Sequence, residues 1–208
     1  MIAVTEPTST SDLRLLKGAR TRATITRHAV DIASVEGLTG VSIGRLATDL
    51  GLSKSGVATL FGSKENLQVA AVDAAREVFV ERIVRPALSE PAGLPRLRAL
   101  IDRWLDYVTE PVFPGGCFRA ATLTEFDSRP GPVRDALARD RRDWLGLLAG
   151  EYRRAREDGA VPDRDPDEAA FEIDAVLAAT NTALRLDDAR AAATARSIVD
   201  HILNANPR

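Results

Sequence analysis

Residues 41–56 read VSIGRLATDLGLSKSG, and residues 61–67 read FGSKENL. Ser42 and Ser53 each precede a short apolar pattern of helical period, and serine is a preferred helix N-cap. In the first pattern the apolar residues recur at i, i+3, i+4 and i+7, as Ile43, Leu46, Ala47 and Leu50. Gly51 permits a tight turn between the patterns. The stretch therefore predicts two short helices joined by a four-residue turn, residues 50–53.

The second of these helices has two unlike sides. Its apolar side holds Val57, Leu60 and Phe61, and its small or polar side holds Lys54, Ser55, Gly56 and Thr59. Small side chains let the backbone approach base edges in a major groove about 12 Å wide. The pair of helices is thus typical of a DNA-binding helix-turn-helix. The alternative is a helix pair that serves packing alone.

Helical periodicity also dominates outside this stretch, and no alternating pattern predicts a sheet. A helix over residues 20–36 ends at Gly37, and Ser63 can cap a long helix that runs to about Arg85 and is closed by Pro86. Five further helices are expected over residues 94–109, 116–128, 132–158, 166–187 and 189–204. The predicted fold is all-α, with about nine helices.

Composition agrees with a globular protein, with 45% hydrophobic and 28% charged residues. No uncharged apolar run approaches the roughly 18 residues that span a bilayer, and the first residues do not resemble a signal peptide. We therefore expect no membrane association and a cytoplasmic location. Residues 1–64 carry eight Lys/Arg and five Asp/Glu, a net charge of +3, so the remainder carries −5. A basic head on an acidic body suits a protein that docks one end on a polyanion.

The two quoted runs, together with the preceding VEGL at residues 35–38, closely resemble the DNA-binding domain of TetR-family repressors. The resemblance covers about residues 20–67, and GGCF at 115–118 followed by Glu125 and Phe126 is similar to a regulatory-domain pattern in one branch of that family. Residues 1–17 are rich in Ser, Thr and Pro and are expected to form a disordered lead. The resemblance implies a three-helix DNA-binding domain (18–64) and a ligand-binding and dimerisation domain (65–208). It also implies a homodimer that a small-molecule effector releases from a palindromic operator on double-stranded DNA.

By the same resemblance, Ser42 and Lys64 contact phosphates and the polar side of the second short helix faces the bases. With the basic stretch before the motif, the expected DNA-binding residues are Arg20, Arg22, Ser42, Arg45, Ser53, Lys54, Ser55, Gly56, Thr59 and Lys64. One departure is Leu60, because the family commonly has Tyr or His there to reach a phosphate. Either Leu60 packs inward, or binding relies more on the lysines and the basic stretch.

An effector pocket is expected among the aromatic residues of the middle helices, although aromatics at helical spacing often form ordinary core. The candidate ligand-binding residues are Trp104, Tyr107, Phe113, Cys117, Phe118, Phe126 and Trp144. Cys117 is either a reactive thiol at a helix N-terminus or a buried small side chain. His28 and His201 have no partner at metal-ligand spacing, and no catalytic motif occurs, so we expect no metal, no cofactor and no enzyme activity.

Dimerisation is expected through the last two helices. One apolar stripe contains Ile173, Val176, Leu177, Thr180 and Leu184, and the other contains Ala191, Ala195, Ile198 and Ile202. Packing of the same faces within one chain is the alternative. For the function, two alternatives to a ligand-released repressor stay open: a DNA binder of the same fold without ligand-induced release, and an interaction adaptor that has lost DNA binding.

Overall fold

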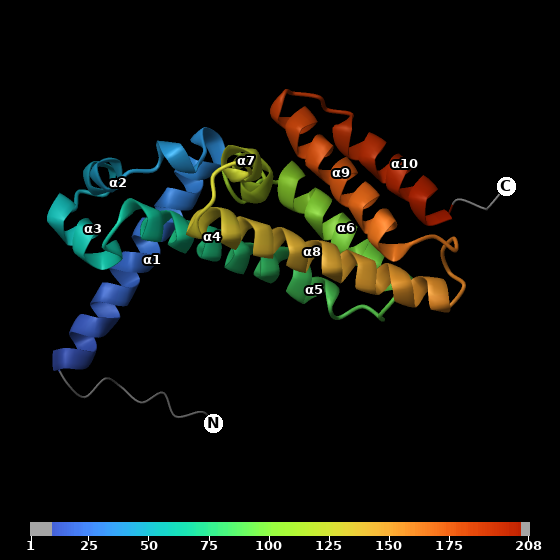
Figure 1. The fold of residues 1–208 in the computed structure, drawn as a ribbon, viewed down its shortest axis with the longest axis horizontal. Coiled ribbons are helices and arrows are strands. Elements are labelled where there is room, and N and C mark those ends of the chain that lie inside the picture. Colours follow the sequence, from blue (N-terminus) through green and yellow to red (C-terminus); the bar gives the residue numbers. More distant parts are fainter. Residues whose placement is uncertain (1–9, 205–208) are drawn as a thin grey trace.

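The computed structural model describes residues 10–204, and the regular secondary structure in this range is entirely helical, with no β-strand in it. Figure 1 shows an elongated molecule with α2 and α3 at one end and α9 and α10 at the other. The elements in chain order are α1 (Thr10–Glu36), the 3-10 turn η1 (Leu38–Gly40), α2 (Ile43–Asp49), α3 (Lys54–Phe61), α4 (Lys64–Phe79), the π-turn η2 (Val80–Val84), α5 (Arg85–Ala87), α6 (Leu94–Thr109), α7 (Phe118–Phe126), α8 (Pro132–Glu157), α9 (Pro166–Arg185) and α10 (Ala191–Asn204). Residues 10–204 thus contain nine helices if the continuous segment α4–η2–α5 is counted once, and the all-α prediction is confirmed.

Helix α1 is longer than predicted at its N-terminus. It begins at Thr10, whereas the sequence pattern predicted a start near Arg20 after a disordered lead over residues 1–17. Residues 10–17 of that lead are helical, so this part of the prediction is wrong, and residues 1–9 lie outside the described range. The sequence pattern missed this part of the helix because Leu15 and Leu16 are exposed. A helix that does not bury its apolar side chains shows no amphipathic pattern in the sequence.

The segment after α4 also differs from the prediction, because Pro86 does not end it. A π-turn over Val80–Val84 precedes the proline, with the Arg85 amide donating to the Val80 carbonyl. Proline lacks an amide hydrogen and crowds the preceding turn, so a local change in helical pitch accommodates it. The helical segment then continues to Ala87, and the Leu88 amide donates to the Val84 carbonyl at 3.1 Å.

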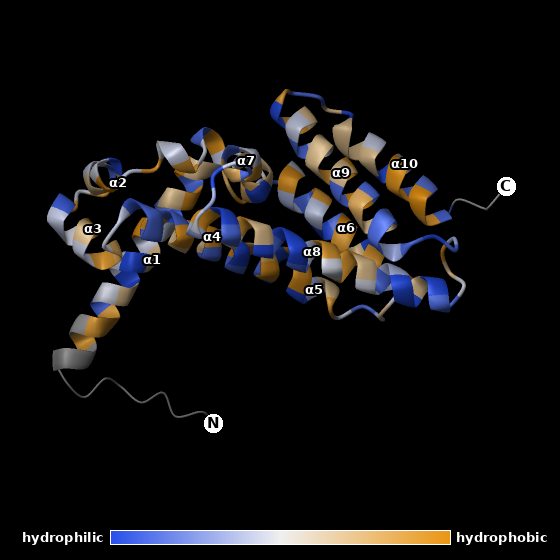
Figure 2. Ribbon diagram, viewed as in Figure 1, coloured by the Kyte–Doolittle hydropathy of each residue, from blue (hydrophilic) through white to orange (hydrophobic). Residues whose placement is uncertain are grey.

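The five later helices lie within two residues of their predicted bounds. Helix α8 is central to this part, because it packs against α4, α6 and α9. Its Leu137, Leu148 and Tyr152 are among the largest fully buried side chains. Figure 2 shows hydrophilic and hydrophobic residues alternating along these ribbons, as expected of amphipathic helices around one core. Within residues 10–204 no helix is both long enough and apolar enough to cross a membrane.

The stripes proposed for dimerisation are largely used inside the chain. In α9, Ile173, Leu177 and Thr180 are buried, and in α10 Ala191, Ala195 and Ile202 are buried. Helix α9 packs on α8 and α10, so most of the predicted stripe is intramolecular core. Ile198 remains exposed, and Val176 and Leu184 are partly buried. If these helices dimerise, they do so through other faces.

Candidate nucleic-acid interface and ligand pocket

Three serine side chains cap the helices of the motif. The Ser42 Oγ accepts from the Arg45 amide at 3.1 Å, the Ser53 Oγ from the Gly56 amide at 3.1 Å, and the Ser63 Oγ from the Asn66 amide at 3.0 Å. Each cap satisfies an amide that the first helical turn cannot pair. Gly51 has φ +63°, the left-handed conformation that a tight turn requires. These local features fix where α2, α3 and α4 begin.

The predicted reading face of α3 is not covered by the rest of the described chain. Lys54, Ser55, Gly56 and Thr59 are exposed, whereas Val57 and Phe61 are buried on the opposite side. Leu60 is partly buried and packs against the core, which supports the inward alternative for this position. Among the side chains that the structure describes, no carboxylate lies within ion-pair distance of Lys54. The structure therefore leaves a small, polar helix side with a cation accessible to a ligand, while its contact with DNA stays a prediction.

Arg22 fixes the other end of α3. Its Nη1 donates to the Leu60 carbonyl at 2.7 Å, and its guanidinium lies over the Phe61 ring at 4.4 Å. A cation at a helix C-terminus is favourable because the last carbonyls carry partial negative charge. Arg22 was predicted only as a DNA contact, and the structure gives it this additional role in holding α3 on α1. Arg20 and Lys17, two and five residues closer to the N-terminus, are exposed.

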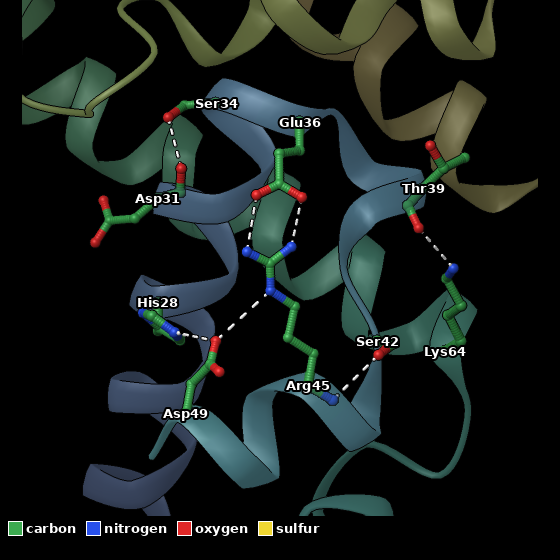
Figure 3. Close-up of polar contacts among 9 residues, drawn as sticks. All are labelled: His28, Asp31, Ser34, Glu36, Thr39, Ser42, Arg45, Asp49 and Lys64. Atoms are coloured by element: carbon green, nitrogen blue, oxygen red, sulfur yellow. Dashed lines mark hydrogen bonds and ion pairs between the residues drawn. The ribbon is translucent and has the colours of Figure 1, made fainter.

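Arg45, predicted as a DNA contact, lies between two carboxylates (Figure 3). Its two terminal nitrogens donate to Glu36, the second at 2.8 Å, and its Nε lies 3.6 Å from the Asp49 carboxylate. The hydrogen bond from Arg45 holds the pKa of Glu36 below its ordinary value. Asp49 also contacts the His28 Nε2 at 3.0 Å. Arg45 therefore ties α2 to the end of α1, and a phosphate would have to compete with these carboxylates for it.

Lys64 and the turn η1 form a second contact within the DNA-binding part. The Lys64 Nζ donates to the Thr39 carbonyl at 3.0 Å, as Figure 3 shows. The amides of Leu38 and Thr39 donate to the two carboxylate oxygens of Glu125, each at 2.7 Å. Glu125 belongs to α7, so a side chain from the second part of the chain holds the turn between α1 and α2. Sequence reasoning missed this role, because nothing in a periodic pattern pairs residues so far apart in the chain.

The loop before α7 forms a further contact between the two parts. The Gly115 amide donates to the Ser34 Oγ of α1 at 2.9 Å, and the Cys117 amide donates to the Asn181 Oδ1 of α9 at 2.8 Å. A Cβ at Gly115 would lie 1.7 Å from the Ser34 carbonyl oxygen, so only glycine fits here. The glycine pair of the GGCF run thus lets the loop approach α1 and α9 closely.

A pocket of about 560 Å³ lies among α6, α7, α8 and α9, a size common for small-molecule sites. Of the predicted ligand-binding residues, Trp104 and Cys117 line it. Its wall also includes Leu123, Arg141, Asp174 and small residues of α9, which are Ala175, Ala178, Ala179 and Thr182. Arg141 and Asp174 form an ion pair at 3.1 Å. The pocket is therefore a mixed surface, mostly apolar with a few charged groups.

The other predicted ligand-binding aromatics lie elsewhere. Tyr107 and Trp144 pack edge-on against Phe79, with ring centroids 6.0 Å and 5.1 Å away, and Phe113 packs on Tyr107 at 6.2 Å. Phe118 is buried, and Phe126 lines a smaller pocket of about 260 Å³ beside Leu123. The structure thus brings only two members of the predicted set to the large pocket.

Cys117 and Arg119 show how burial changes side-chain chemistry near the pocket. Burial raises the pKa of the Cys117 thiol, which opposes the reactive-thiol alternative and favours a small core side chain. Arg119 is buried and forms an ion pair with Asp140 at 2.6 Å, with its guanidinium 4.4 Å from the centre of the Phe79 ring. This pair was not predicted, since burial of a charged residue is not visible in a sequence pattern.

A family model described as the tetracyclin repressor-like C-terminal domain matches residues 93–199, just over half of the chain. The chain belongs to the TetR family. A TetR regulator from Chloroflexus aurantiacus J-10-FL is 26% identical, with a TM-score of 0.80 over 88% of this chain and 93% of that chain. This agreement extends the likeness to the whole fold, including the DNA-binding part.

Two more distant structures show the same fold. A regulator from Agrobacterium tumefaciens is 20% identical, with a TM-score of 0.78 over 88% of this chain and 98% of that chain. AibR, solved in complex with isovaleryl coenzyme A and operator DNA, is 19% identical, with a TM-score of 0.70 over 88% and 98% of the two chains. No sequence among the curated proteins matches the chain.

Proposed function

We propose that this TetR-family protein is a repressor that binds a palindromic operator and leaves it when a small molecule occupies the pocket between α7 and α9. The family and the fold support a role in DNA-binding transcriptional regulation. The observation that carries the proposal is the uncovered side of α3, with Lys54, Ser55, Gly56 and Thr59 exposed beside a capped N-terminus. AibR, with the same fold, was solved with both operator DNA and a small molecule.

A physical connection supports coupling between pocket and DNA. Helix α7 carries Leu123 and Thr124 on the pocket wall, and its Glu125 holds the η1 turn through two hydrogen bonds. A ligand that shifts α7 displaces this carboxylate, and with it the turn that leads into α2. Because α2 packs on α3, the orientation of the reading face changes. Allosteric coupling commonly amounts to about 5–150-fold in affinity.

DNA selection from a random duplex pool tests the DNA-binding half of the proposal. Selected sequences should contain two inverted half-sites whose centres lie about one helical turn apart, because a dimer presents two α3 helices to successive major grooves. Thr59→Ala should relax the preference at one position in each half-site, whereas exposed Arg153→Ala, at the far end of α8, should leave the motif unchanged. Failure of the wild-type protein to enrich any sequence would favour the adaptor alternative.

A compound screen tests the second part of the proposal, that a small molecule releases the protein from its operator. A ligand that binds the folded state raises the melting temperature by mass action. Compounds that raise it should lower operator affinity in the same concentration range, and pocket variants such as Leu123→Trp should weaken both effects together. If every stabilising compound leaves operator affinity unchanged, the protein is a DNA binder of the same fold without ligand-induced release.

A further inference from the structure

The wall of the large pocket contains one deeply buried charged side chain, Arg119 of α7. Its side chain is 8% exposed. The other charged groups of the wall, Asp127, Arg141 and Asp174, are more exposed to solvent. A buried charge costs free energy unless hydrogen bonds and an opposite charge compensate it fully. The partners of Arg119 therefore indicate which ligand group the inner end of the pocket can bind.

The hydrogen bonds of Arg119 are incomplete. Its Nε donates to the Asp140 Oδ2 at 2.6 Å, but its two terminal nitrogens donate to no atom of the described residues, and protein atoms do not enclose them completely. Asp140 is also shared, because its Oδ1 lies 3.6 Å from the Arg76 Nε of α4. A guanidinium carries five N–H donors in a planar fork. Most of the donors of Arg119 therefore lack an acceptor in the protein.

Trp144 of α8 adds a second donor without an acceptor. Its ring centre lies 5.8 Å from the Arg119 Cζ, and its buried Nε1 has no hydrogen-bond partner in the part of the chain that the structure describes. Phe79, with its ring centre 4.4 Å from the same Cζ, offers no oxygen acceptor. Buried donors without acceptors are unfavourable, so this region favours a ligand group that brings acceptor oxygens.

The rest of the large pocket is mainly apolar. Trp104 and Leu123 line it, together with three alanines of α9, Ala175, Ala178 and Ala179. On the other side of Arg119, toward Phe79, the free space is only about 10 Å³, which is too small for a ligand group. A ligand therefore reaches the guanidinium from the large pocket, and the remainder of that ligand lies against apolar side chains.

We propose that the pocket binds an apolar monocarboxylate, with its carboxylate on the terminal nitrogens of Arg119 and its apolar body beside Trp104 and Leu123. The guanidinium fork matches the two oxygens of a carboxylate. One negative charge fits better than two, because Asp127 and Asp174 also line the pocket and repel a dianion such as phosphate. The inference rests on the proposed function in taking this pocket as the effector site.

Arg119 also connects the pocket to the helices that lead to the DNA-binding part. Glu125, which holds the η1 turn, follows six residues later on α7, about 9 Å along the helix axis. A carboxylate that draws Arg119 toward the pocket weakens its contact with Asp140, and Asp140 contacts Arg76 of α4. The ligand therefore acts on both α4 and α7.

Matched compounds test the ligand class in the absence of DNA. Octanoate, octanamide and octylamine share one alkyl chain, and 2-naphthoate, 2-naphthamide and 2-naphthylmethylamine share one ring system. In isothermal titration calorimetry, the carboxylate of at least one set should bind about tenfold more tightly than its amide and its amine, because a charge-assisted hydrogen bond to a guanidinium is the stronger one. Octyl phosphate should bind less tightly than octanoate. If neither carboxylate is preferred, or if octyl phosphate binds more tightly, the proposal is wrong.

Substitutions test whether Arg119 carries the preference. The double variant Arg119→Met/Asp140→Asn removes both charges and leaves neither buried and unpaired, so it should fold and bind the preferred carboxylate and its amide equally. The matched control is Arg164→Met/Glu172→Gln, which removes an ion pair outside the pocket wall and should keep the tenfold preference. If Arg141→Met abolishes the preference instead, the carboxylate binds at the more exposed end of the pocket, which overturns the assignment to Arg119.

A conservative variant gives a second measurement in case the double variant does not fold. Arg119→Lys keeps the positive charge beside Asp140 but lacks the planar fork, so its preference for the carboxylate should fall at least about threefold. Circular dichroism checks the folding of both variants. An unchanged preference in a folded variant of Arg119 overturns the proposal.

The outcomes separate this proposal from the proposed function. If a monocarboxylate binds through Arg119 but leaves operator affinity unchanged, the ligand site is correct and the release mechanism is wrong. If no carboxylate is preferred, yet a compound of another class binds the pocket and releases the operator, the proposed function stands and the ligand class is wrong.

Discussion

In the DNA-binding part, some basic side chains hold the helices together, whereas others are exposed and available to bind. Arg45 and Arg22 look alike in the sequence as basic residues near the motif, yet both are engaged within the chain, with Glu36 and with the Leu60 carbonyl. Lys54 keeps its charge exposed. The serine caps could be predicted, because a cap depends on residues within one turn. The partners of the arginines could not, because they depend on how α1 lies against α2 and α3.

The Arg45–Glu36 pair predicts a pH dependence of stability. Arg45 lowers the pKa of Glu36 from its ordinary value of 4.5, so the fold favours the ionised carboxylate. The resulting stabilisation is complete above about pH 4.5 and is lost as the pH falls through the lower folded-state pKa. Between pH 6 and about pH 3 the melting temperature of Glu36→Gln should therefore fall less steeply than that of the wild type. The control is Glu110→Gln, at an exposed position, whose melting temperature should fall with pH as steeply as that of the wild type. If the melting temperatures of all three proteins fall equally steeply, the pair does not have this role.

The observed bounds of a helix agree closely with the predicted bounds where a proline or glycine lies near its ends. The bounds of α6 and α8 lie within one residue of the predicted ranges, and proline or glycine lies close to both ends of each helix. Helix α1 was predicted too short, because its first turns expose their apolar side chains and show no core-facing pattern. The loop over residues 110–117 corresponds to the gap between the helices predicted over residues 94–109 and 116–128. Its contacts with Ser34 and Asn181 arise from packing and carry no sequence period.

Two glycine substitutions, one in that loop and one in α8, should have opposite effects on stability. Gly115→Ala should destabilise the protein by at least about 2 kcal/mol, because its Cβ would overlap the Ser34 backbone and force the loop away from α1. Gly146→Ala, on the exposed side of α8 with open space around it, should stabilise by about 0.5–1 kcal/mol. Urea unfolding monitored by circular dichroism measures both. A Gly115→Ala protein as stable as the wild type would show that the loop does not hold α1 in this way.

At the scale of the whole molecule, the all-α class and the helix-turn-helix could be predicted, whereas the pocket could not. Its wall is assembled from four helices, and five of the seven aromatic or sulfur residues chosen from the sequence lie elsewhere. Periodicity distinguishes a buried side from an exposed one, but it does not tell a core position from a pocket wall. For the same reason the predicted dimer stripe proved largely internal, while the side of α9 that lacks strong apolar periodicity, with Phe171, Ala175 and Ala178, is exposed.

The central claim is that the exposed side of α3 binds duplex DNA, and the salt dependence of operator binding tests it most directly. Fluorescence anisotropy with a selected operator should give an affinity that falls steeply with salt. Lys54→Ala should weaken binding about tenfold or more and reduce the salt slope by about one for each half-site, with the melting temperature unchanged. Arg153→Ala should match the wild type. Equal affinity and slope for Lys54→Ala and the wild type would contradict the claim.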